Sequence, residues 1–357
     1  MPRMRFGTFI RALACLLAAA VALGGCGSGG STTTSSGAAP KSRPAPPKSA
    51  FPSAEGKSLE EVLESAHPSE LVVSPAAQVF YRGENRFPFG VFEKDRTQVA
   101  DAEIALYFAS VPHVSQKAEK PGAKGPAARA QIKALEEPAV GPFPAKIETL
   151  ATMPAFRAQT TSKDPDSASV VYTTNIDFPK NGEWRIAAVI REGDQISTTL
   201  LPSVIVGEFK RVPTVGEKAP LIHTPTPADV GGDLSKITTR IPPDTQNRVD
   251  YADALGKEPI FLLFATPQFC QSRVCGPVVD VAEQVKQLYG DKAAFIHMEI
   301  YKDNDPTKGP NQQVRAFHLP SEPWLFAIER DGTIGAVIEG AFGVDKLTEV
   351  VEKVTGG

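Results

Sequence analysis

The apolar residues between positions 71 and 209 recur in short runs, several of which alternate with polar residues. Turn residues such as Pro, Gly, Asn and Asp separate these runs. A period of two is typical of strands that bury one face, so an all-β domain is predicted here. The predicted strands are Leu71–Val73, Gln78–Tyr81, Phe87–Phe92, Glu103–Phe108, Val170–Asn175, Trp184–Ile190, Ile196–Leu201 and Val204–Phe209.

Together these runs predict an immunoglobulin-like β-sandwich over residues 68–209. Near its end, Asn175–Pro179 followed by Gly182–Trp184 resembles a segment of exported sandwich domains that are associated with copper handling. Residues 113–129 are rich in Lys, Ala, Pro and Gly, and this composition indicates a surface excursion between the two halves of the domain.

The apolar pattern changes after residue 210. Ile260–Phe264 is an unbroken apolar run, long enough for a buried strand and too short for a helix. A helix is predicted to begin near Pro277, because proline suits a first helical turn, where its missing N–H has no partner. The apolar residues with the helical spacing are Val278, Val281, Ala282, Val285 and Leu288. Cys270 and Cys275 lie between the strand and the helix, where unpaired N–H groups favour thiolate over thiol.

Further elements follow in a regular order. Ala293–Tyr301 and Trp324–Ile328 are predicted strands, and Val344–Val354 has the period of a closing helix. Before them, the many prolines between residues 213 and 243 indicate an extended connector with little regular structure. A short helical turn is predicted at Asp250–Leu255.

The order of strand, Cys-Gly-Pro and helix resembles the active-site region of the thioredoxin superfamily. Val215–Pro220 resembles the opening motif of the redoxin branch and of membrane-anchored thioredoxin-like proteins of cytochrome maturation. Pro323 stands directly before a predicted strand, where the family keeps a cis-proline beside its cysteines. The resemblance implies an α/β thioredoxin-like domain over residues 210–357, with Cys270, Cys275 and Pro323 as the redox site.

The cysteine spacing departs from that of the family. Thioredoxins have two residues between their cysteines, and this chain has four. Residues five apart in an intact helix lie about 8–9 Å from each other, so a bridge requires a loop before Gly276. Either Cys275 is the attacking cysteine, with Val278 at its usual partner's position, or Cys270 attacks, as in peroxiredoxins of the Q type. The buried carboxylate that the family keeps on the preceding strand is missing, because that region is Phe261-Leu262-Leu263.

The N-terminus has the pattern of an export signal. Three arginines precede the apolar run Ala12–Leu23, which is too short to span a bilayer and suits a signal peptide. Leu23-Gly24-Gly25-Cys26 resembles a bacterial lipobox, which implies removal of residues 1–25 and lipidation of Cys26; the alternative is an ordinary secretory signal. The protein is therefore expected outside the cytoplasm, anchored to the bacterial cell membrane. Residues 26–67 are rich in Gly, Ser, Thr and Pro and predict a disordered tether.

The number of cysteines and the net charge limit the classes of function that are considered. Of four cysteines, Cys15 leaves with the signal and Cys26 carries lipid, so Cys270 and Cys275 are the thiols of the folded protein. A four-cysteine metal site is thereby excluded. The net charge of −3 gives no general attraction to nucleic acid.

The leading hypothesis is a thiol-disulfide oxidoreductase that needs no cofactor and acts on protein thiols or disulfides outside the cytoplasm. One alternative is a copper-binding protein of the cytochrome oxidase assembly type, with Cys270, Cys275 and His318 as ligands. In that case His297 is interpreted as a packed strand residue. Another alternative is a non-catalytic protein with a structural disulfide. Peroxide reduction is a further one, although Thr266 lies one residue further from Cys270 than in peroxiredoxins.

Overall fold

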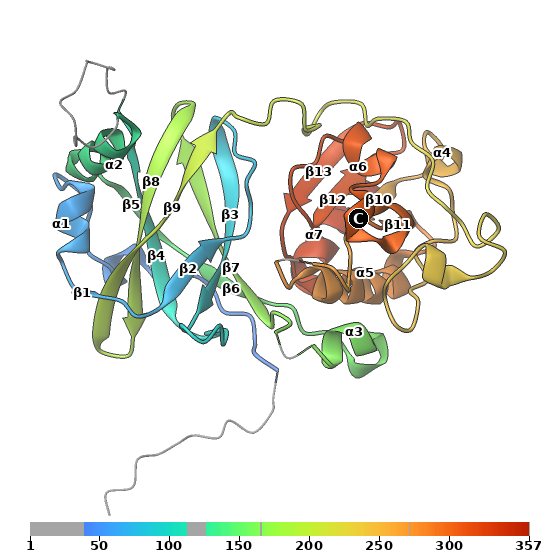
Figure 1. Cartoon of the computed structure of the whole chain (residues 1–357), viewed down its shortest axis with the longest axis horizontal. Coiled ribbons are helices and arrows are strands. Elements are labelled where there is room, and N and C mark those ends of the chain that lie inside the picture. Colours follow the sequence, from blue (N-terminus) through green and yellow to red (C-terminus); the bar gives the residue numbers. More distant parts are fainter. Residues whose placement is uncertain (1–38, 113–125, 165, 271, 357) are drawn as a thin grey trace, which may run out of the picture. The chain divides into compact units, whose positions relative to one another are not determined.

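The computed structural model describes residues 39–112, 126–164, 166–270 and 272–356 (Figure 1). The predicted signal peptide, Cys15, Cys26 and the first part of the predicted tether lie outside these residues. So does most of the predicted excursion, after which α2 forms at Pro126–Glu136. Among the described residues, no helix is both long and apolar enough to cross a membrane.

The first part of the described chain is β-rich and contains two sheets. One sheet has the order β2-β3-β7-β6, and the other has the order β1-β9-β8-β4-β5. Neighbouring strands are antiparallel except β1 and β9, which are parallel. The strands are β1 His67–Pro68, β2 Val72–Pro75, β3 Gly83–Phe92, β4 Glu103–Ser110, β5 Val140–Pro144, β6 Lys146–Thr149, β7 Val170–Phe178, β8 Gly182–Glu192 and β9 Gln195–Val206.

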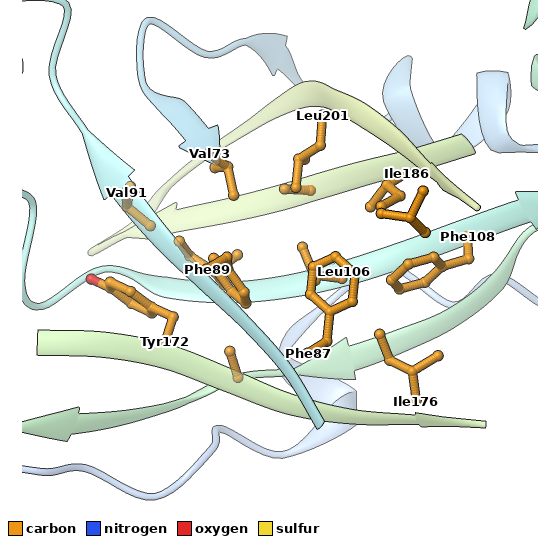
Figure 2. Packing of buried hydrophobic residues seen from close by; sticks show 14 of the residues in the cluster. Val73, Phe87, Phe89, Val91, Leu106, Phe108, Tyr172, Ile176, Ile186 and Leu201 are labelled. Carbon is orange, nitrogen blue, oxygen red and sulfur yellow. The ribbon is translucent and has the colours of Figure 1, made fainter. Parts of the chain in front are cut away.

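Alternate residues of the two sheets share one hydrophobic core (Figure 2). Phe87 of β3 packs edge-on against Phe108 of β4, with ring centroids 5.5 Å apart. Phe89 stacks on Tyr172 of β7 at the same separation, 5.5 Å. The prediction of a β domain is therefore confirmed, because strands of both sheets bury the faces that the alternation marked. Its immunoglobulin-like topology stays a prediction.

Some predicted strands differ from the observed ones. Gln78–Tyr81 is not a strand, and only Phe80 makes a single bridge, to Val206. The two runs predicted after residue 195 form one continuous strand, β9. β5 and β6 were not predicted. β5 contains Gly141, Pro142 and Pro144, which are typical of turns.

The prediction of a disordered tether is wrong for residues 39–67. This segment contains a short 3-10 helix, η1 Lys48–Ala50, and a helix, α1 Leu59–Leu63, whose first turn is closed by a capping box between Ser58 and Glu61. Leu59 and Val62 are fully buried against the outer face of β4 and β8. The few apolar residues of the segment are spaced to cover this face, although the overall composition resembles that of a linker.

The C-terminal sheet has the order β11-β10-β12-β13. β10 and β11 are parallel, whereas β12 is antiparallel to both β10 and β13. Helices α5 and α7 pack on one face, and α4 and α6 pack on the other. The strand, helix, strand, strand and closing helix follow in the predicted order, so the predicted α/β domain is confirmed. Its thioredoxin-like assignment stays a prediction. The elements are α4 Tyr251–Ala254, β10 Ile260–Phe264, α5 Cys275–Tyr289, β11 Ala294–Met298, α6 Gln312–Ala316, β12 Trp324–Ile328, β13 Ile334–Glu339 and α7 Val344–Thr355.

The connecting segments contain only short helices. The segment between β6 and β7 contains η2 Pro154–Phe156 and α3 Gln159–Ser162, and the connector after β9 contains η3 Leu234–Lys236. Two further turns, η4 Lys302–Asn304 and η5 Pro306–Lys308, follow β11. The predicted short helix before β10 is confirmed by α4.

Candidate redox site

Cys270 and Cys275 are joined by a disulfide, with their Cα atoms 5.8 Å apart. This separation is normal for a disulfide and shorter than a five-residue step along an intact helix. The bridge forms because α5 begins at Cys275, so the residues before it follow a loop path. Arg273 in this loop has a φ of 63°, a left-handed conformation that tightens the turn.

The two sulfurs occupy different environments. Cys275 is fully buried at the start of α5, whereas Cys270 is partly exposed. The backbone N–H of Cys275 donates to Sγ of Cys270 over 3.2 Å, and the Ser272 hydroxyl lies 3.3 Å from the same sulfur. After reduction, a negative charge on Cys270 would meet this N–H and the positive end of the helix. Cys270 is therefore the more accessible sulfur of the pair.

The loop from Cys270 to Cys275, called the cysteine loop below, is linked to the segment that contains Pro323. The bond between Glu322 and Pro323 is cis, as the resemblance implied. The Ser272 hydroxyl donates to the carbonyl oxygen of Glu322 over 3.3 Å. The structure therefore brings the residue before Pro323 into contact with the loop of Cys270 and Cys275, although the role of Pro323 in catalysis stays a prediction.

His318 lies in an exposed turn after α6, with a φ of 53°. Among the residues that the structure describes, no group of three or more His, Cys, Asp or Glu side chains is arranged to hold a metal ion. His318 therefore belongs to no such group in the described part of the chain, where Cys270 and Cys275 are bonded to each other.

The segment between β6 and β7 also holds the cysteine loop, and sequence analysis missed this contact. Ala168 donates its N–H to the carbonyl oxygen of Arg273 over 3.0 Å. The guanidinium of Arg273 lies 3.2 Å from Asp166. Gly276 is needed beside this segment, because a Cβ there would lie 2.9 Å from the Thr161 hydroxyl. These contacts fix the loop path on the side of α5.

A buried ion pair anchors α5 to the connector. Nε of Arg240 lies 2.9 Å from Oδ1 of Asp280, and the two side chains are 6% and 1% exposed. Arg240 also donates to the carbonyl oxygens of Phe156 and Pro242, over 2.6 and 2.8 Å. The other carboxylate oxygen of Asp280 accepts the N–H of Ala158 over 3.1 Å. Both charges are thus compensated by hydrogen bonds, as buried charges require.

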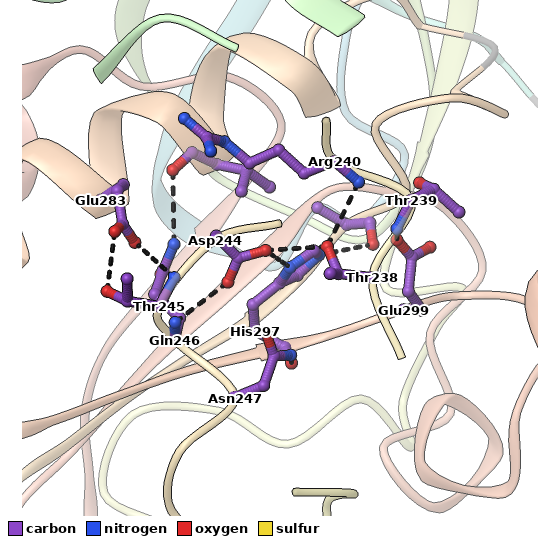
Figure 3. Close-up of polar contacts among 12 residues, drawn as sticks. Thr238, Thr239, Arg240, Asp244, Thr245, Gln246, Asn247, Glu283, His297 and Glu299 are labelled. Carbon is purple, nitrogen blue, oxygen red and sulfur yellow. Dashed lines mark hydrogen bonds and ion pairs between the residues drawn. The ribbon is translucent and has the colours of Figure 1, made fainter. Parts of the chain in front are cut away.

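His297 is part of a second buried pair (Figure 3). Its Nδ1 lies 2.9 Å from Asp244, and its Nε2 lies 3.1 Å from the carbonyl oxygen of Ala265, at the end of β10. Because both ring nitrogens face acceptors, the imidazolium form is favoured. Burial is the largest influence and lowers the pKa of His297, but the charge and hydrogen bond of Asp244, with the charge of Glu299 and the carbonyl oxygen of Ala265, together raise the pKa to about 9. The interpretation of His297 as a packed strand residue agrees with its full burial.

The contribution of His297 to stability is expected to decline as pH rises. Its pKa in the folded chain, about 9, is above the ordinary value of 6.5, so the stabilisation is complete below pH 6.5 and is lost through pH 9. Urea unfolding of wild type and His297→Gln between pH 5.5 and 9.5 measures it. The stability difference between the two proteins should shrink with rising pH; a constant difference would contradict the assignment.

Comparisons with known proteins give a limited result. No protein-family profile matches the chain, and no curated protein matches it. Among solved structures, the chain is similar to the crystal structure of a thiol:disulfide interchange protein, a thioredoxin family protein from Chlorobium tepidum TLS. The sequence identity is 16% and the TM-score is 0.29, over 40% of this chain and 99% of that chain.

Proposed function

We propose that the protein is a thiol-disulfide oxidoreductase whose redox couple is the pair Cys270 and Cys275. The observation that supports it is the asymmetry of the disulfide. One sulfur is partly exposed and faces a helix N-terminus, and the other is buried directly behind it. Thiol-disulfide exchange needs such an accessible thiolate and a nearby second thiol that releases the mixed disulfide.

In the reducing direction, the thiolate of Cys270 attacks one sulfur of a substrate disulfide. A bond forms between Cys270 and the substrate, and the other substrate sulfur leaves as a thiolate that takes a proton from solvent. Cys275 then loses its proton and attacks Sγ of Cys270, which restores the disulfide and releases the second substrate thiol. The substrate gains two electrons from the cysteine pair and two protons, one that Cys275 gives up and one from solvent; the oxidising direction is the reverse.

The same proposal includes location and partners. The N-terminal pattern supports export, removal of residues 1–25 and attachment to the membrane through lipid on Cys26. Protein thiols and disulfides outside the cytoplasm are then the substrates, and a disulfide persists in such a compartment. The β-rich region, for which we keep the immunoglobulin-like assignment, precedes the redox part on the same chain.

The reduction potential tests the proposal against a structural disulfide. The protein is equilibrated with mixtures of reduced and oxidised glutathione, and its free thiols are trapped by alkylation and counted by mass spectrometry. We expect a potential between about −300 and −120 mV, the range of exchange-active proteins. Resistance to reduction, with a potential far below about −300 mV, would show that the bridge is structural.

A further inference from the structure

A buried carboxylate lies beside the cysteine loop and is not used in the exchange steps. Glu299 follows β11 directly and is 2% exposed. β10 and β11 are parallel neighbours, and the N–H of Ala265 donates to the carbonyl oxygen of Met298 over 3.1 Å. Glu299 therefore lies beside the start of the segment that leads from β10 to Cys270. Both lie at the end of the sheet where the parallel strands β10 and β11 terminate.

Glu299 is connected to that segment through Thr239 of the connector, which lies beside it in Figure 3. Its Oε1 accepts the N–H of Thr239 over 2.6 Å. The hydroxyl of Thr239 accepts the N–H of Gln268 over 3.2 Å, and the side-chain amide of Gln268 donates to the carbonyl oxygen of Thr239 over 2.7 Å. Gln268 stands two residues before Cys270. One hydrogen-bonded chain thus joins the carboxylate to the cysteine loop.

The second carboxylate oxygen of Glu299, Oε2, accepts no hydrogen bond from the described residues of this network. Among the described residues, Oε2 of Glu299 and the hydroxyl of Thr266 are both buried and make no hydrogen bond of normal geometry, although Thr266 lies near enough to lower the pKa of Glu299. Thr266 belongs to the same segment as Gln268 and is fully buried. Leaving a buried carboxylate oxygen unpaired is costly when the group is ionised, and a proton on the carboxyl group removes most of that cost.

The surrounding charges do not neutralise Glu299. His297 on β11 already pairs with Asp244 of the connector, and Arg240 of the connector pairs with Asp280 of α5. Glu299 is thus the carboxylate in excess within this buried cluster. Burial raises its pKa, while the charge of His297, the hydrogen bonds from Thr239 and the nearby hydroxyl of Thr266 together lower it by less. The carboxyl group of Glu299 therefore holds a proton more readily than an exposed glutamate does.

We propose that Glu299 is a positioning residue that couples its own protonation to the state of the Cys270–Cys275 pair, acting through Thr239 and Gln268. The inference rests on the proposed function, because it concerns the same redox pair. Reduction adds two electrons from a thiol donor and breaks the disulfide, leaving Cys275 as a thiol and Cys270 as a thiolate. Like charges oppose each other, so Glu299, joined to the residues before Cys270 through Thr239 and Gln268, takes up a proton from solvent when the thiolate forms.

The test uses the full-length reduced protein and the variant Glu299→Gln. The substitution removes the charge and retains an oxygen that accepts the N–H of Thr239. Alkylation rates by iodoacetamide are measured from pH 5 to 9, with mass spectrometry assigning each thiol. We expect the pKa of Cys270 to fall by about one unit, so that alkylation at acidic pH becomes about tenfold faster.

Glu283→Gln is the matched control. Glu283 on α5 accepts hydrogen bonds from Thr245 of the same connector and has no hydrogen bond to the described residues of the cysteine loop. Its variant should have the wild-type alkylation profile. A Glu299→Gln profile identical to that of wild type would overturn the inference, as would an equal shift in Glu283→Gln.

A second variant keeps the inference testable if Glu299→Gln does not fold. Thr239→Val retains the N–H that Glu299 accepts and removes the hydroxyl that Gln268 contacts. Its alkylation profile should also shift along the pH axis, and an unshifted profile would overturn the coupling. Alkylation is measured on the thiols themselves. A wild-type protein that fails to exchange disulfides would therefore refute the proposed function alone.

Discussion

Cys275→Ser is expected to convert the protein into a trap for its substrates. Cys270 remains accessible and faces the N–H of residue 275, so it still attacks a substrate disulfide. Without the buried thiol, the mixed disulfide is not resolved, and turnover should fall to the background rate. Incubation with a disulfide-bonded protein such as insulin, followed by intact-mass measurement without reductant, should show a covalent adduct on Cys270.

Cys270→Ser is the control for this experiment. Its remaining thiol, Cys275, is fully buried, so little or no adduct is expected. A stable adduct in Cys270→Ser and none in Cys275→Ser would reverse the assignment. That result would support the other register left open by the sequence, in which Cys275 takes the place of the family's attacking cysteine.

The sequence predicts the secondary structure of the C-terminal domain, residues 210–357, well wherever the local residue pattern determines it. The apolar run Ile260–Phe264 forms the central strand β10, and every residue of it is buried. A strand that is covered by helices on both faces needs apolar residues throughout, so an unbroken apolar run predicts it. Pro277 lies in the first turn of α5, where its lack of an N–H costs nothing. The helix itself begins at Cys275, which leaves a loop before it for the disulfide.

The connector shows where local patterns fail. Its prolines correctly indicate little regular structure, but its polar residues suggest solvent exposure. Thr238, Thr239, Arg240 and Asp244 are instead all less than 7% exposed. Their burial depends on partners far along the chain, such as Asp280 and His297, and no periodicity within residues 237–247 encodes those contacts. The sequence therefore did not predict the buried carboxylates near the cysteine loop. It did show that β10 itself contains no carboxylate.

Arg240→Met is expected to destabilise the C-terminal α/β part strongly. Methionine is similar in length, but it leaves Asp280 as an uncompensated charge in the interior and removes the donors to Phe156 and Pro242. Breaking a buried pair on one side costs about 3–5 kcal/mol. Chemical denaturation at neutral pH should show a loss of this size in the free energy of unfolding.

Two further variants separate the buried charge from the loss of contacts. Lys218→Met removes an ion pair with Asp331 whose side chains are 65% and 64% exposed, so it should cost at most about 1 kcal/mol. The double variant Arg240→Met with Asp280→Leu removes both buried charges and should recover much of the stability that the single variant loses. If the double variant is as unstable as Arg240→Met, the cost comes from the lost hydrogen bonds to Phe156 and Pro242. The charge left on Asp280 would then not be the cause.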